Sequence, residues 1–305
     1  MATISSIRKQ TKAGLAGFID LLGFSQRVRS VNTFKELLEV REQIAIAQDH
    51  FDIGKTDELY KEYLNVTGQI DFVLSDSIFT FIPLQSEVIS YSDELDTVMA
   101  DLEKIALSQA SCVLNGVFIR GGISLGWFYS DRKNFISDAL VDAVNLEKEI
   151  CYPVIAVSKS IMNKYRNSPQ RKYYSESADP FNNDFFLNLT ISGKSISYIN
   201  YLKLAVEAVS PVFTKEERQK RRKMSPEKSQ KYENQKYWEA QTEFLLQHKK
   251  AIESGAHLAL GNRRARSKYR WLARYHNSIA LPFQKIDPKV VIGRKLTGSN
   301  YLLTQ

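Results

Sequence analysis

Two aspartates stand in stretches that are otherwise apolar enough to be buried strands. Asp20 closes the stretch GLAGFID, and Asp76 lies in QIDFVLSDSIFTFIPL, within a turn of Ser75-Asp76-Ser77 between two apolar arms. A buried carboxylate is costly unless it is paired, hydrogen-bonded or bound to a metal. Two such acids at neighbouring ends of a sheet would repel each other unless a divalent cation lay between them. Taken alone, either acid could equally be a helix cap or a turn residue.

The donor atoms expected around the two acids narrow the choice of metal. Carboxylates and backbone carbonyls are the hard oxygen ligands that Mg²⁺ and Mn²⁺ prefer, and one or two carboxylates are often joined by substrate phosphates. None of the four histidines falls near either aspartate in the sequence, and no spacing of histidine and cysteine is typical of a zinc site. The two acids therefore predict phosphate chemistry assisted by a hard divalent ion.

The elements that would position these acids alternate along the first 200 residues. Short apolar stretches predict strands, and apolar residues repeating every three or four positions predict helices. The resulting order is strand, helix, hairpin, helix, strand, helix, strand, which predicts an α+β fold with helices covering one face of a mixed sheet. Residues 184–201 read as a further hairpin that turns at Ser192-Gly193-Lys194.

Composition and charge separate a second part of the chain. The 305 residues are 43% hydrophobic and 25% charged, as in ordinary globular proteins. Residues 215–275 hold 17 lysines and arginines against 7 glutamates and read as charged helices with an exposed break at RRKMSPEKS. We therefore expect a catalytic domain over residues 1–205 and a basic helical extension over residues 206–305, packed on it.

The chain also carries signals about its location. Its two cysteines make a disulfide scaffold improbable and suit a reducing cytoplasm. No uncharged stretch reaches the roughly 18–20 residues that a bilayer-spanning helix needs. Asp20 interrupts the apolar run near the N-terminus, and no small-residue cleavage site follows it, unlike in a signal peptide. We expect a cytoplasmic protein that has no membrane partner.

Four segments together resemble a known family, the class III nucleotidyl cyclases. FIDLLGFS is similar to their first metal-binding motif, and SDSIFTF is similar to their second, with Ser75 in place of glycine. IRGGISLG follows their Arg-x-Gly-Ile-x-x-Gly strand, and SDALVDAVNLE resembles the helix that comes next. The segments occur in family order over about residues 14–160. The resemblance implies a class III cyclase-like mixed or antiparallel sheet covered by helices, with a helical C-terminal extension.

Departures from the family pattern concern the nucleotide base. Purine-using cyclases have a base-selecting lysine four positions before the second metal acid, where this chain has Phe72. Their asparagine and transition-state arginine fall at Val141 and Asn145, whereas both metal acids remain. Together with RGGIS, ALVDAVNLEKE and KYRWLARYHN, this pattern is most similar to the pyrimidine cyclases of bacterial Pycsar antiphage defence, which make cyclic UMP or cyclic CMP as an infection signal.

The resemblance implies a reaction and a set of site residues. UTP, favoured over CTP, would be converted to its 3′,5′-cyclic nucleotide and pyrophosphate with two Mn²⁺ or Mg²⁺ ions. Asp20, Asp76 and the Leu21 carbonyl would hold the ions. The remaining expected roles are phosphate binding by the turn at Gly23, Phe24 and Ser25, a substituted cation at Arg120, a polar contact at Asn145, and base stacking at Phe72.

Other readings of some of these residues stay open. Arg120 could instead form an ion pair at the end of a strand, and Phe72 could belong to the core. The family implies a homodimer with sites at the subunit interface, and a downstream effector that senses the product. Two further alternatives are a non-catalytic cyclase-like nucleotide-binding module and a nucleic-acid-binding protein. The second would use arginines interleaved with Tyr269, Trp271 and Tyr275, although alternating charges are more typical of solvated helices.

Overall fold

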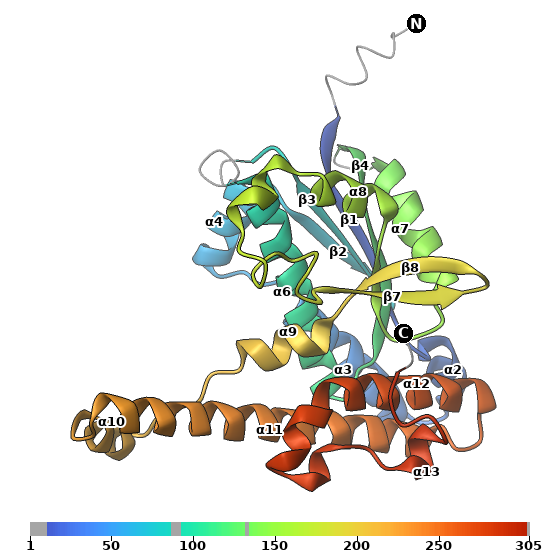
Figure 1. Cartoon of the computed structure of the whole chain (residues 1–305). Helices are drawn as coiled ribbons and strands as arrows, with labels where there is room; N and C mark the ends of the chain where they lie inside the picture. The colour runs from blue at the N-terminus through green and yellow to red at the C-terminus, as the bar shows by residue number, and fades with distance from the viewer. Residues whose placement is uncertain (1–10, 87–92, 132–133, 304–305) are drawn as a thin grey trace, which may run out of the picture. The chain divides into compact units, whose positions relative to one another are not determined.

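The computed structural model describes residues 11–86, 93–131 and 134–303 (Figure 1). The chain divides into two compact units, which meet in the sequence between Tyr201 and Leu202. The first unit contains every described strand, and the second is helical. No helix within the described ranges is long and apolar enough to cross a membrane.

The first unit is built on one mixed sheet. Its strand order is β2-β3-β1-β4-β6-β8-β7, with β5 paired to β4. Among the described strands, β4 and β6 form the one parallel pair, and the other pairs are antiparallel. The strands are β1 (Lys12–Leu21), β2 (Ile70–Leu74), β3 (Ser77–Pro83), β4 (Ile119–Ser130), β5 (Phe135–Ser137), β6 (Ile155–Val157), β7 (Phe186–Ile191) and β8 (Lys194–Ile199). The predicted α+β class is confirmed.

The helices of this unit begin where the sequence supplies capping side chains. Asp93 and Ser137 each accept a hydrogen bond from a backbone N–H in the first turn that follows them, and Thr33 forms a capping box with Glu36. The helices are α2 (Phe24–Arg29), α3 (Phe34–His50), α4 (Glu58–Thr67), α6 (Glu94–Leu114), α7 (Asp138–Glu149), α8 (Lys159–Arg166) and the 3-10 helix η1 (Pro169–Tyr173).

Helices lie on both faces of the sheet. Phe81 of β3 packs in one buried cluster with Ala139 of α7. Its neighbours in the strand, Thr80 and Ile82, instead line a small cavity with α6. Successive side chains of a strand point to opposite faces, so α6 and α7 cover opposite sides, as Figure 1 also shows. The expectation that helices cover one face only is wrong, because periodicity reveals that a helix has an apolar face but not which side of the sheet receives it.

The second unit is a group of helices. The predicted break in RRKMSPEKS is confirmed, since one helix ends at Arg222 and the next begins at Pro226. Tyr269, Trp271 and Tyr275 are all buried, so they are not available to stack on nucleic-acid bases. The helices are α9 (Tyr201–Ala208), α10 (Lys215–Arg222), α11 (Pro226–Leu258), α12 (Arg263–Ala280), η2 (Leu281–Lys285), η3 (Pro288–Val290) and α13 (Arg294–Thr297).

A pair of fully buried histidines joins α11 to α12. The Nδ1 atoms of His248 and His276 lie 3.0 Å apart, and His276 Nε2 lies 2.9 Å from the Val290 carbonyl oxygen. His276 must therefore donate from Nε2 and accept at Nδ1 from the Nδ1–H of His248. A proton added to His276 would place two donors against each other. Burial lowers the pKa of His276 to about 4 and the pKa of His248 well below 6.5.

This pair predicts a loss of stability in mild acid. Both rings are neutral in the folded state, so their contribution is complete above the unfolded pKa of about 6.5 and is lost as pH falls toward 4. The pair is tested by comparison with His248→Leu/His276→Leu, in which every other titrating group is unchanged. From urea titration followed by tryptophan fluorescence, the free energy of unfolding of the natural protein relative to this variant should be about 2 kcal/mol or more lower at pH 5 than at pH 7.5. The exposed-histidine variant His257→Gln should behave like the natural protein. A difference in stability that is the same at both pH values would contradict the assignment.

Candidate active site

The two predicted metal acids meet at one end of the central strands. In β1, Asp20 is paired with Ser77 of β3 on one side and with Arg120 of β4 on the other. Asp76 lies in the short turn between β2 and β3, where Ser75 has a φ of 60°. The Leu21 N–H donates to the Asp76 carbonyl oxygen over 3.2 Å, which fixes the turn against β1. Hairpin geometry therefore brings together residues that are 56 positions apart.

The carboxylates of Asp20 and Asp76 interact directly. The pKa of Asp20 is raised from 3.8 to about 7, first by burial, then by the charge of Asp76 and by a side-chain hydrogen bond with it. The charge of Glu147 raises this pKa further, and the charge of Arg120 opposes the rise. Asp76 and Glu147 thus both add negative charge beside Asp20, against the one positive charge of Arg120, and this surplus of negative charge favours a bound cation.

Arg120 is held firmly beside Asp20. One of its terminal nitrogens, Nη2, forms an ion pair with Glu147 and lies 3.5 Å from Asp20 Oδ2. The other, Nη1, donates to the Ile150 carbonyl oxygen over 3.2 Å. Both interpretations of Arg120 therefore describe part of its surroundings: it lies at the predicted site, and it belongs to an ion pair at the end of a strand.

Glu147 is the site residue that the sequence interpretation missed. It lies on the buried side of α7 in line with Ala139 and Ala143, at helical spacing, and it is only 4% exposed. A charged residue on an otherwise apolar helical stripe was the available signal. Gly122 permits the close approach of α7, since a Cβ there would lie 2.2 Å from the Ala143 carbonyl oxygen.

The structure does not bring Asn145 to the acids of its own chain. Asn145 precedes Glu147 by two positions on α7, and two helical steps of 100° turn its side chain to the opposite side of the helix. Asn145 is exposed, as is Val141 one turn earlier, with 60% of that residue accessible to solvent. Asn145 therefore lies on the exposed side of α7, away from the buried side that carries Glu147.

Phe72 lies among other aromatic rings on one face of the sheet. It is paired with Phe79 across the β2–β3 hairpin, and the two rings stack with centroids 4.5 Å apart and an interplanar angle of 6°. The edge contact with Phe135 has a centroid distance of 5.5 Å. One face of the Phe72 ring is thus occupied by Phe79, and the residue is half-buried.

The turn predicted to bind phosphates follows β1 directly. Gly23 has a φ of 82°, in the left-handed region that favours glycine, and α2 begins at Phe24. The Gly23 carbonyl accepts the first bond of the helix from the Arg27 N–H, so the N–H groups at Phe24 and Ser25 have no partner inside the helix. Because α2 has only six residues, its helix dipole would contribute less to holding a phosphate than hydrogen bonds from these N–H groups.

The donor set fits a hard divalent ion. Two adjacent carboxylates, one with a strongly raised pKa, are the arrangement that a cation between them would stabilise. In an antiparallel ladder the N–H and C=O of one residue point to the same neighbour, so the Leu21 carbonyl is directed toward the Asp76 side. Among the described residues, no cluster of three or more histidine, cysteine or acidic side chains is arranged to hold a metal.

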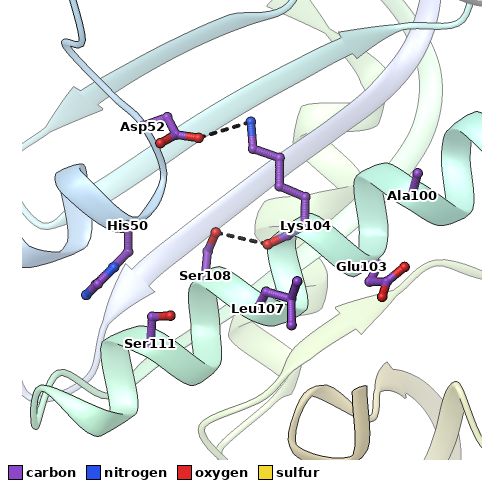
Figure 2. Close-up of a pocket in the computed structure, with 8 residues that line it drawn as sticks. All are labelled: His50, Asp52, Ala100, Glu103, Lys104, Leu107, Ser108 and Ser111. Atoms are coloured by element: carbon purple, nitrogen blue, oxygen red, sulfur yellow. Dashed lines mark hydrogen bonds and ion pairs between the residues drawn. The ribbon is translucent and has the colours of Figure 1, made fainter. Parts of the chain in front are cut away.

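A separate cavity lies away from these acids. It has a volume of about 410 Å³ and is lined by the end of α3 and by α6, including His50, Asp52 and Lys104 (Figure 2). Lys104 is 3.3 Å from Asp52 and lies over the Tyr63 ring, 4.8 Å from its centroid. His50 Nε2 is 3.0 Å from the Asn115 amide nitrogen. These contacts already occupy His50, Asp52 and Lys104, so we assign the cavity no role.

The chain is similar to several solved structures of nucleotide cyclases. No protein-family model matches the chain, and no curated protein sequence matches it. A bacterial light-regulated adenylyl cyclase is 14% identical with a TM-score of 0.31, covering 64% of this chain and 96% of that chain. The guanylyl cyclase Cya2 is 12% identical with a TM-score of 0.34, covering 62% of this chain and 91% of that chain.

A third solved structure has similar values. The catalytic core of a rhodopsin-guanylyl cyclase with converted specificity, in complex with ATPαS, is 13% identical with a TM-score of 0.34, covering 62% of this chain and 95% of that chain. Since all three TM-scores are below 0.5, the superpositions do not decide function. The functional assignment depends on the residues of the site itself.

Proposed function

We propose that this chain is a pyrimidine nucleotide cyclase, which converts UTP or CTP to the 3′,5′-cyclic nucleotide and pyrophosphate. The observation that carries the proposal is the convergence of Asp20 and Asp76 at one end of the sheet, with the pKa of Asp20 raised to about 7. Such a pair suits hard divalent ions, Mn²⁺ or Mg²⁺, held by these two carboxylates and by the Leu21 carbonyl. Two ions per site is part of the proposal.

In this reaction the 3′-oxygen of the ribose forms a bond to the α-phosphorus, and the bond from that phosphorus to the bridging oxygen of pyrophosphate breaks. Asp20, Asp76 and the Leu21 carbonyl would hold divalent ions, which would lower the pKa of the 3′-hydroxyl and neutralise charge on the triphosphate. The hydroxyl proton passes to solvent. The N–H groups at Phe24 and Ser25 bind phosphate oxygens. Arg120 adds positive charge beside Asp20.

Pyrimidine use and dimerisation form a second part of the proposal. The resemblance places Phe72 where purine-using cyclases carry a lysine, so base selection would depend on an aromatic ring. The exposed position of Asn145 supports a homodimer in which one subunit supplies the acids and its partner supplies Asn145. The same proposal includes a catalytic domain at residues 1–205 with a helical extension at residues 206–305. It also includes a cytoplasmic location, an antiphage signalling role and a downstream effector that senses the product.

Incubation with each of the four nucleoside triphosphates and Mn²⁺, followed by mass spectrometry of the products, tests this function. We expect cyclic UMP from UTP, or cyclic CMP from CTP, and little product from ATP or GTP. Product from ATP or GTP alone would overturn the pyrimidine assignment. Binding of a triphosphate without any cyclic product would instead identify a non-catalytic nucleotide-binding module.

A further inference from the structure

A groove separate from the paired acids lies between α7, α8 and the β7–β8 hairpin of the first unit, elements that are labelled in Figure 1. Its volume is about 650 Å³, within the range of small-molecule sites. Its lining combines apolar side chains with hydroxyl and amide groups. The apolar lining residues are Leu146, Val157, Met162 and Ile196, and the neutral polar ones are Asn163, Asn188, Ser195 and Ser197.

Three cations border this groove against one acid. Lys159 and Arg166 come from α8, Lys194 comes from β8, and Glu149 is the acid. Lys194 is 2.9 Å from Glu149, but 68% of its side chain is exposed, so this ion pair is weak. In the part of the chain that the structure describes, neither Lys159 nor Arg166 forms an ion pair. Both of these cations are therefore free to meet an anionic ligand.

The lining chemistry selects one class of ligand. Two unpaired cations seven residues apart on one helix, with an amide between them at Asn163, suit phosphate oxygens. The apolar lining residues suit an uncharged organic body rather than a bare ion. We propose that this groove binds a phosphorylated organic molecule of nucleotide size, with Lys159 and Arg166 on its phosphates, independently of the metal site at Asp20 and Asp76.

The groove and the candidate active site share the last turns of α7. Leu146 and Glu149 line the groove, whereas Glu147 and Ile150 hold Arg120 beside Asp20. Neighbouring residues of one short segment thus line the groove and hold Arg120. A ligand in the groove would act on the segment that positions Arg120, although binding itself does not depend on the proposed cyclase activity.

Isothermal titration of the whole protein in EDTA tests the proposal, with UTP and inorganic pyrophosphate as separate probes. EDTA removes divalent ions, so binding through paired acids and metal is excluded. We expect UTP to bind more tightly than pyrophosphate, because its nucleoside can contact the apolar lining residues. The double variant Lys159→Gln/Arg166→Gln should weaken UTP binding by about tenfold or more, since it removes both positive charges that would meet the phosphates.

Two control variants separate this inference from general charge effects and from the cyclase proposal. Lys35→Gln/Arg41→Gln removes the same charge from exposed positions of α3 and should leave UTP affinity unchanged. Asp20→Asn/Asp76→Asn should retain UTP binding in EDTA while losing any cyclase activity. Unchanged affinity in the Lys159→Gln/Arg166→Gln variant, equal loss in the α3 control, or UTP binding no tighter than pyrophosphate would overturn the inference and leave the proposed function standing.

Discussion

Asp20→Asn is expected to abolish cyclic nucleotide formation and, at pH 8, to make the protein more stable. Catalysis is lost because the neutral amide cannot replace a carboxylate ligand of a divalent ion. A bound metal ion lowers the activation free energy by several kcal/mol, so its loss corresponds to a fall of about 10³-fold or more in kcat. Stability rises because the substitution removes a buried charge that Asp76 repels, the combination that raises the pKa of Asp20 to about 7.

The sign of the stability change depends on pH. The folded pKa of Asp20, about 7, lies above the usual value of 3.8, so the folded state holds the proton more tightly and stability falls as pH rises from 3.8 to 7. Above this window the carboxylate carries its full cost, with an upper bound of about 4 kcal/mol at 1.36 kcal/mol per pH unit. Urea titrations at pH 8 and pH 4 should show the gain at pH 8 and almost none at pH 4.

The matched control is Glu62→Gln, which changes an exposed carboxylate of α4 to an amide. This variant should alter neither product formation nor the pH dependence of unfolding. Asp76→Asn should also lose activity, because both carboxylates are needed for the ions. Retained turnover in Asp20→Asn would remove the basis of the cyclase proposal. Lost turnover with lower stability at pH 8 would mean that Asp20 supports the fold rather than the reaction.

Local sequence signals predicted the elements that carry the site. Apolar arms around Ser75-Asp76-Ser77 indicated the β2–β3 hairpin, and Ser137 indicated the start of α7. The turn at Ser192 and Gly193 was predicted for the same reason, and both residues have positive φ, as tight hairpins require. Each of these features is encoded within a few neighbouring residues, which is why a single sequence reveals it.

Features that depend on packing between distant elements were not predicted. The short strand β5 has only three residues, too few for an alternating pattern, and the sequence interpretation does not include α4, although Asp57 caps it. Glu147 could be recognised as unusual on its stripe, but its partner Arg120 lies 27 residues earlier, on another element. The close packing of α7 on β4 needs the missing side chain of Gly122, and this need becomes visible only when the positions of both elements are known.

Arg120→Met is expected to lower the free energy of unfolding of the first unit by about 3–5 kcal/mol, because it leaves Glu147 buried without the guanidinium that neutralises it. The same substitution removes the positive charge that opposes the raised pKa of Asp20. The double variant Arg120→Met/Glu147→Leu replaces the pair with apolar side chains of similar size. It should recover most of that loss, since such replacements of buried ion pairs are often close to neutral.

Turnover in the double variant separates two roles of Arg120. If Arg120 contributes charge at the metal site, Arg120→Met/Glu147→Leu will be stable in urea titration but slow in the product assay with UTP and Mn²⁺. If Arg120 serves only to neutralise Glu147, kcat will return together with stability, and its assignment to the reaction fails. Glu147→Gln provides the intermediate case, because it keeps a hydrogen-bonding partner for Arg120 while freeing the guanidinium charge to act on Asp20 alone. This variant should therefore retain more activity than Arg120→Met.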